Sequence, residues 1–195
     1  YINELNSFDD ELNQRFFIRT VFRLEADSAF DRNVFCQQFS ERSKAFDMEW
    51  ELTPLDYKPK VVIMVSKYDH CLNDLLYRYR TGNLSVEICA VISNHTDLQS
   101  LTEWHDIPFY HCPITPGTKT QQESQVQSIL DQYQCELLVL ARYMQVLSHE
   151  MCEVWAGKAI NIHHSLVPGF KGAKPYHQAN NKGVKRVGAP ARYVR

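Results

Sequence analysis

One apolar stretch decides the fold of this chain: Lys60-Val61-Val62-Ile63-Met64-Val65-Ser66. Its apolar residues follow one another without a polar interruption, and turn-like residues flank them. This pattern is typical of a strand that is buried on both faces, as in a parallel sheet. Similar short runs occur at residues 86–92 and 137–141, with a weaker one at residues 159–162.

Segments of helical length separate these runs, at residues 69–79, 97–105, 120–133 and 148–155. Strands that alternate with helices predict βαβ crossovers and a mostly parallel, Rossmann-like sheet with helices on both faces. In such α/β folds, ligands bind beyond the carboxyl ends of the strands. We therefore expect the functional residues just after the apolar runs.

The chain before this sheet has a different pattern. Residues 15–24 alternate between apolar and polar side chains, as in a half-buried antiparallel strand. Residues 28–46 have helical spacing, and residues 47–52 alternate again. We predict an incomplete α+β domain at residues 1–53, a polar linker with two prolines at residues 54–59, and the α/β domain at residues 60–195.

Composition excludes several classes of protein. The chain has 195 residues, of which 44% are hydrophobic and 23% charged, as in ordinary globular proteins. It contains no apolar run of the roughly 20 residues that would span a bilayer, and no visible secretory leader. Its six cysteines are scattered, which favours reduced thiols and a cytoplasmic protein. The first of seven glycines is Gly82, so the early strands are followed by no glycine-rich phosphate loop or dinucleotide fingerprint.

Charge is distributed unevenly. Residues 1–153 contain 13 basic and 23 acidic residues, a net charge of −10, whereas residues 154–195 contain eight basic residues and no acidic one. The basic segment is open to three interpretations: a solvated tail, an anion site, or a domain whose balancing acids follow Arg195. We expect the 195 residues to be a fragment.

The strongest candidate site is Asn161-Ile162-His163-His164-Ser165, at the end of a predicted parallel strand. Alternation along the strand places Asn161 and His163 on one side. An amide N–H and an imidazole N–H are suited to stabilise an oxyanion on a carbonyl carbon. A satisfied loop histidine beside an exposed one is the simpler alternative. The spacing fits no zinc site, and we expect no metal.

Several stretches of the chain resemble the formyltetrahydrofolate deformylases, a family of the formyl-transferase fold. The resemblance rests on Asn161-Ile162-His163-His164-Ser165-Leu166-Val167-Pro168 and its continuation to Ala179, together with four shorter stretches in the same order. These are Ser66-Lys67-Tyr68-Asp69-His70-Cys71-Leu72, Val91-Ile92-Ser93-Asn94-His95, Pro113-Ile114-Thr115-Pro116 and Ala141-Arg142-Tyr143-Met144-Gln145-Val146-Leu147-Ser148. Residues 1–53 resemble the later part of the ferredoxin-like ACT-type domain that precedes the hydrolase domain in this family.

The resemblance implies an enzyme that hydrolyses 10-formyltetrahydrofolate to tetrahydrofolate and formate, which supplies formate for purine biosynthesis and balances one-carbon pools. Asn161 and protonated His163 would hold the formyl oxygen. The pterin and formyl groups would lie against Met144, Gln145, Val146 and Leu147. The general base would be an aspartate that follows Arg195.

The resemblance also implies a cytoplasmic homo-oligomer that takes a small folate substrate, with no separate cofactor and no nucleic-acid or membrane partner. The chain departs from the family pattern at Pro190, Arg192 and Arg195, where threonine, histidine and threonine are usual. These departures affect the region next to the expected base.

Two alternatives remain open at this point. A glycinamide ribonucleotide formyltransferase would use the same formyl donor with an amine acceptor, but it should have a glycine-rich loop after its first strand. A non-catalytic folate-binding or regulatory protein would explain the absence of a carboxylate from residues 154–195, with residues 1–53 as the sensor of a small molecule.

Overall fold

The computed structural model describes residues 1–11, 14–24, 30–162 and 191–193. The chain divides after Pro54 into two compact units, each of which is described by itself. Among the described residues, no helix is both long and apolar enough to span a membrane.

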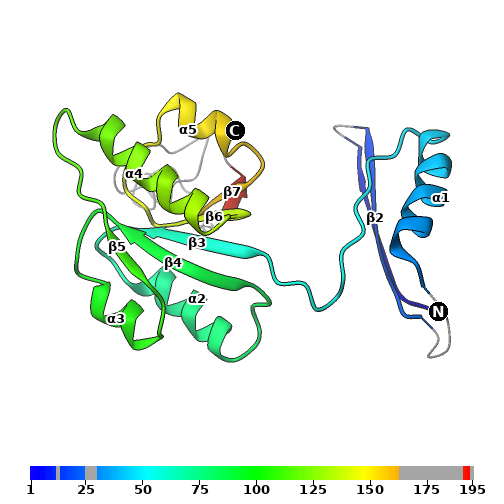
Figure 1. Cartoon of the computed structure of the whole chain (residues 1–195), viewed down its shortest axis with the longest axis horizontal. Coiled ribbons are helices and arrows are strands. Elements are labelled where there is room, and N and C mark those ends of the chain that lie inside the picture. The colour runs from blue at the N-terminus through cyan, green and yellow to red at the C-terminus, as the bar shows by residue number, and fades with distance from the viewer. Residues whose placement is uncertain (12–13, 25–29, 163–190, 194–195) are drawn as a thin grey trace, which may run out of the picture. The chain divides into compact units, whose positions relative to one another are not determined.

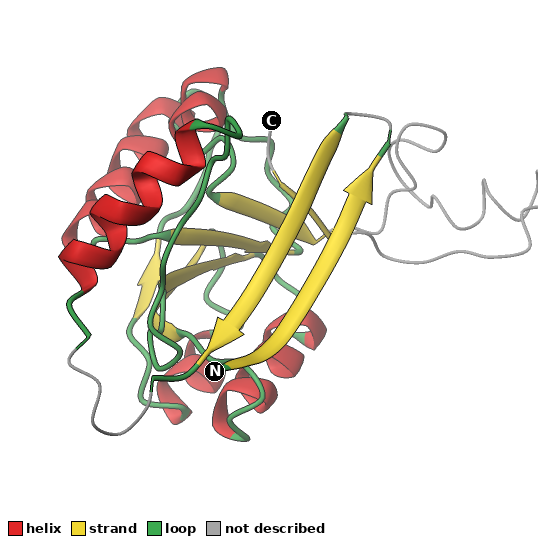
Figure 2. Ribbon diagram, turned by 90° about the vertical axis from the view of Figure 1, so that its right-hand side faces the viewer, coloured by secondary structure: helices red, strands yellow, loops and turns green. Residues whose placement is uncertain are grey.

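The first unit is an antiparallel hairpin with one helix. Strands β1 (Ile2–Asp10) and β2 (Arg15–Phe22) form the long ribbon in Figure 2, and α1 (Arg32–Lys44) follows them. The Asp31 carboxylate caps α1, because its Oδ1 accepts hydrogen bonds from the backbone N–H groups of Asn33 and Val34 over 2.7 and 3.1 Å. Phe35 of α1 lies 5.8 Å from Phe22 of β2, centroid to centroid, which attaches the helix to one end of the ribbon.

One expectation for this unit requires correction, and another is confirmed in part. Residues 47–52 form no strand, because the Met48 N–H bonds to the Ser43 carbonyl at the end of α1, and Trp50 packs on Phe39 at a centroid distance of 4.8 Å. The predicted strand at residues 15–24 does form, as β2. Its apolar face is only partly covered, however, and Ile18 remains 53% exposed.

The second unit is a six-stranded sheet in the order β5-β4-β3-β6-β7-β8, in which the first five strands are parallel and β8 is antiparallel to β7. The strands are β3 (Lys60–Val65), β4 (Glu87–Ser93), β5 (Phe109–His111), β6 (Leu137–Ala141), β7 (Ala159–Ile162) and β8 (Ala191–Tyr193). The predicted α/β architecture with a parallel sheet is confirmed.

Helices cover both faces of this sheet. Figure 1 shows α2 (His70–Arg80) and α3 (Gln99–Trp104) on one face, and α4 (Lys119–Gln132) and α5 (His149–Val154) on the other. Alternate residues of β3 accordingly enter two separate cores. Ile63 packs with Leu72 and Leu76 of α2, whereas Met64 packs with residues of α4. Ile63 and Met64 are each 1% exposed, and such burial stabilises the fold by roughly 1.5–3 kcal/mol per side chain.

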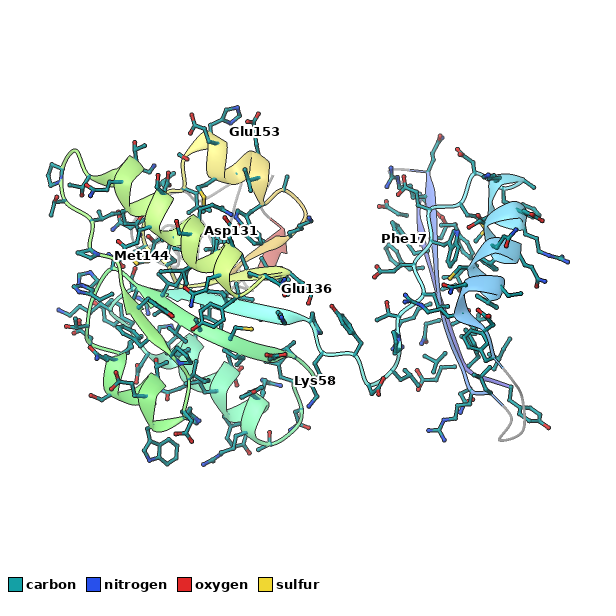
Figure 3. All side chains as sticks on the ribbon, in the orientation of Figure 1. Phe17, Lys58, Asp131, Glu136, Met144 and Glu153 are labelled. Atoms are coloured by element: carbon teal, nitrogen blue, oxygen red, sulfur yellow. The ribbon has the colours of Figure 1, made fainter. Side chains whose placement is uncertain are left out.

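The two ends of the sheet differ in role. In Figure 3, Glu136 lies at one end and Met144 at the other, because Glu136 precedes β6 and Met144 follows it. Glu136 fixes the amino end of β3, since its Oε2 accepts the Lys60 N–H over 2.8 Å and its other oxygen accepts the Tyr57 hydroxyl. The carboxyl ends of the strands lie at the Met144 end.

Candidate active site

The five parallel strands end together at one edge of the sheet, after Val65, Ser93, His111, Ala141 and Ile162. Residues that follow these positions are brought together by the register of the strands, although they are distant in sequence. This edge is where an α/β sheet places its ligands.

Ser66 connects three of the strand ends. Ser66 is the first residue after β3, and its side chain is buried. Its Oγ donates a hydrogen bond to Oδ1 of Asn94 over 2.8 Å. The same Oγ accepts the backbone N–H of Met144 over 3.0 Å. Ser93 adds a further link, because its hydroxyl donates to the Ser66 carbonyl over 3.3 Å. One buried hydroxyl therefore joins the ends of β3 and β4 to the segment after β6.

Arg142 directs the chain away from β6. Its φ of +57° is in the left-handed region, which a non-glycine residue rarely adopts. Its guanidinium carbon lies 4.2 Å from the ring centroid of Tyr68, and its Nη1 is 3.0 Å from Nε2 of His70. These contacts attach the segment after β6 to the loop after β3.

The predicted folate-binding segment, Met144 to Leu147, follows directly. Met144 and Val146 are exposed, by 56% and 82%, and Gln145 and Leu147 are half-buried. Leu147 packs against the core on the α4 side of the sheet. The segment thus has a fixed backbone at the carboxyl edge, and two of its side chains face solvent.

Asn161 lies in β7, one residue before the strand ends. It is half-buried, and its backbone is level with Leu140 of β6 on one side and Arg192 of β8 on the other. Asn161, near the end of β7, and residues 144–147, which follow the adjacent strand β6, therefore both lie toward the carboxyl edge of the sheet. His163 follows β7 but lies outside the described residues, as do Pro190 and Arg195.

Sequence reasoning gave no role to Ser66, Asn94 or Arg142. All three directly follow buried strands, and this position in the sequence is the one feature that could have marked them as candidate site residues. Their partners could not be predicted without the sheet order, since 78 positions separate Ser66 from Met144.

All six cysteines of the chain are free thiols. Burial raises the pKa of the Cys112 and Cys135 thiols to about 11 each. Within the described ranges, no cluster of three or more histidine, cysteine, aspartate or glutamate side chains is arranged to hold a metal ion.

Known proteins match this arrangement closely. The formyl transferase family matches residues 59–195. A formyltetrahydrofolate deformylase of Corynebacterium sp. (strain P-1) is 50% identical over 194 residues, which are 99% of this chain and 67% of the relative. The chain belongs to the formyltetrahydrofolate deformylases.

Solved structures agree with this family assignment. The crystal structure of a deformylase from Pseudomonas putida KT2440 has a TM-score of 0.86 and 56% identity, and the match covers all of this chain and 68% of that one. A phosphoribosylglycinamide formyltransferase from Coxiella burnetii is more distant, with a TM-score of 0.65 and 29% identity over 71% of this chain and 66% of its own. The chain spans 55–67% of the length of four deformylase relatives.

Proposed function

We propose that this protein hydrolyses 10-formyltetrahydrofolate to tetrahydrofolate and formate. One observation carries the proposal: in a chain of the deformylase family, Asn161 and the 144–147 segment lie at the carboxyl edge of adjacent strands. This placement supports the proposal, because an oxyanion donor and a surface for a heterocycle would then lie at one edge of the sheet.

The reaction needs charge stabilisation at one oxygen. Water attacks the formyl carbon, the carbonyl oxygen becomes an oxyanion, and the carbon–nitrogen bond then breaks. The Asn161 amide and a protonated His163 would donate hydrogen bonds to that oxygen. An aspartate in the segment that follows Arg195 in the resembling family would take the proton from water and pass one to the leaving nitrogen. The water oxygen leaves in formate, and N10 of tetrahydrofolate gains a hydrogen.

The 144–147 segment would bind the pterin and formyl groups. Its backbone amides and carbonyls offer the directional donors and acceptors that distinguish a heterocycle. The Ser66 hydroxyl holds the Met144 N–H, so the first amide of the segment is already committed to the protein. Recognition would therefore fall to Gln145, Val146 and Leu147.

The transferase alternative is less well supported. The residues between β3 and Gly82 contain no glycine, so the loop after β3 cannot approach a substrate phosphate in the manner of a glycine-rich loop. Water therefore remains the proposed acceptor. We further assign residues 1–53 to a partial ACT-type domain, residues 54–59 to a linker and residues 60–195 to the catalytic domain, in a cytoplasmic homo-oligomer.

Formate release tests the function. The complete product of the gene is incubated with 10-formyltetrahydrofolate in the absence of any amine, and formate and tetrahydrofolate are measured. We expect the two products in equal amounts. Turnover that occurs only when glycinamide ribonucleotide is added would identify a transferase instead, and folate binding without turnover would identify a non-catalytic binding protein.

A further inference from the structure

Two neighbouring residues of α4 are buried although both are polar. Gln122 is 3% exposed and Glu123 is 8% exposed, on the side of the helix that faces the sheet core. A glutamate and a glutamine are costly to bury unless their polar atoms are bonded. The hydrogen-bond partners of Gln122 and Glu123 therefore show which parts of the structure these two side chains hold in place.

Gln122 holds the start of the predicted folate-binding segment. Its Nε2 donates to the Tyr143 hydroxyl over 3.2 Å and to the Cys112 carbonyl over 3.4 Å. The Oε1 atom of Gln122 is buried and has no hydrogen-bond partner among the described residues. The side chain therefore holds its neighbours through the N–H groups of Nε2. Tyr143 is itself buried and directly precedes Met144.

Glu123 holds the end of the same segment. Its Oε1 accepts the backbone N–H of Ser148 over 2.8 Å. Ser148 directly follows Leu147 and caps α5, because its Oγ accepts the Met151 N–H over 3.2 Å. The carboxylate therefore fixes the junction between the segment and the next helix.

The two anchors come from one turn of one helix. Consecutive helical side chains diverge by about 100°, so neighbouring residues can reach two separated points of one loop. Together with Ser66, which holds Met144, they fix residues 144–147 at both ends. A pair of leucines would fill this space without needing partners, but it would leave the segment free to move.

We propose that Gln122 and Glu123 are positioning residues that set the backbone of residues 144–147 for folate binding. The proposal rests on the proposed function of that segment. Neither residue would touch the reacting atoms. Their loss would weaken the binding of substrate, product and transition state to the same extent, so that KM rises while kcat is retained.

The same helix provides a matched control. Gln127 of α4 is also hydrogen-bonded through its side chain, because its Oε1 accepts the indole N–H of Trp155 over 3.0 Å. Trp155 follows α5 and lies outside the 143–148 segment. Gln127→Leu therefore removes this tertiary hydrogen bond, together with the bond from Gln127 Nε2 to Asp131 within α4, and neither bond involves residues 143–148.

The experiment compares four variants of the complete protein: Gln122→Leu, Glu123→Leu, Glu123→Gln and Gln127→Leu. Steady-state formate release gives kcat and KM, titration with tetrahydrofolate gives Kd, and thermal unfolding reports stability. We expect Gln122→Leu and Glu123→Leu to raise KM and Kd about tenfold with kcat changed less than about twofold. Glu123→Gln keeps an oxygen that accepts the Ser148 N–H, so its KM and Kd should remain near those of the wild type. The KM and Kd of Gln127→Leu should also remain near the wild-type values.

The outcomes separate this proposal from the function itself. Equal KM and Kd in Gln122→Leu, Glu123→Leu and Gln127→Leu would overturn the positioning role and leave the function intact. A wild-type protein that binds tetrahydrofolate but releases no formate would overturn the function, and the Kd values would still decide the positioning role. If Gln122→Leu fails to fold, Tyr143→Phe removes the same hydrogen bond with the helix unchanged; an unaltered KM and Kd there would count against the proposal.

Discussion

The backbone N–H of Met144 donates a hydrogen bond to Oγ of Ser66 over 3.0 Å, across 78 positions of sequence. The same oxygen donates its own proton to Asn94. Three strand ends at the carboxyl edge thereby share one hydroxyl group. This hydroxyl holds the first backbone N–H of the proposed folate-binding segment, residues 144–147.

Replacing Ser66 should therefore affect both stability and binding. Ser66→Ala leaves the Met144 N–H and the side-chain Oδ1 of Asn94 without this partner, which should lower the free energy of unfolding by about 1–3 kcal/mol. It should also raise KM for the folate. Urea unfolding and steady-state kinetics measure the two effects. Ser128→Ala, which removes an exposed hydroxyl bonded to the Ser124 carbonyl in the preceding turn of α4, should change neither; an equal loss in both variants would contradict the prediction.

Replacing Asn161 should affect turnover. If its amide supports the formyl oxyanion, Asn161→Ala should lower kcat by about a hundred- to a thousandfold, which corresponds to roughly 2.7–4 kcal/mol. KM should change little, because the oxyanion exists only near the transition state. Asn83→Ala, in the exposed turn after α2, is the control. Near-normal turnover in Asn161→Ala would exclude the proposed role.

The contact between Arg142 and Tyr68 should be measurable as a coupling energy. A guanidinium 4.2 Å from a ring centroid gives a cation–π interaction of about 0.5–2 kcal/mol. Urea unfolding of Arg142→Met, Tyr68→Leu and the double variant gives that energy as a deviation from additivity. We expect the double variant to be less destabilised than the sum of the single ones. Additive effects would show that the stacking contributes nothing.

The protein should lose stability in alkaline solution. Burial raises the pKa of the Cys112 thiol from 9.0 to about 11, so the folded state disfavours the thiolate. The thiol's contribution is complete below pH 9 and is lost as the pH rises through 11, by about 1.4 kcal/mol at pH 10 and about 2.7 kcal/mol in full. Urea unfolding with a reductant at pH 7–10.5 tests this. Cys112→Ala should reduce the decline by about 1.4 kcal/mol at pH 10, and an unchanged slope would argue against a buried neutral thiol.

Much of the second unit could be predicted from the sequence, because continuous apolar runs and helical segments alternate there. The strand at residues 137–141 coincides with β6, and the one at residues 86–92 differs from β4 by one residue. The edge strand β5 was missed, since it has only three residues directly after Pro108. Strand β1 was missed as well, because Ile2–Asp10 is mainly polar and most of it is exposed.

Less of the candidate site than of the fold could be predicted from the sequence. Asn161 could be singled out because it lies at the end of an apolar run. Gln122 and Glu123 could not, since their pattern is that of an ordinary polar helix surface. Their burial depends on how α4 packs against the loop after β6, and no local feature of residues 119–132 reports that packing. Residues 47–52 were predicted wrongly because their alternation indicates a strand only if a partner strand is present.

The strand order has a consequence for a chain that is still being synthesised. β3 leaves the ribosome first and pairs with β4 on one side, but its other edge is completed only by β6, which begins at Leu137. At a translation rate of about 5–20 residues per second, that edge stays open for roughly 4–14 s. The open edge belongs to a strand whose last five residues are all apolar, and an unpaired apolar strand is a template for pairing with another nascent chain. A slow codon run or a stalled ribosome between Ser66 and Glu136 would therefore favour aggregation, and a chaperone that binds extended apolar segments would suppress it.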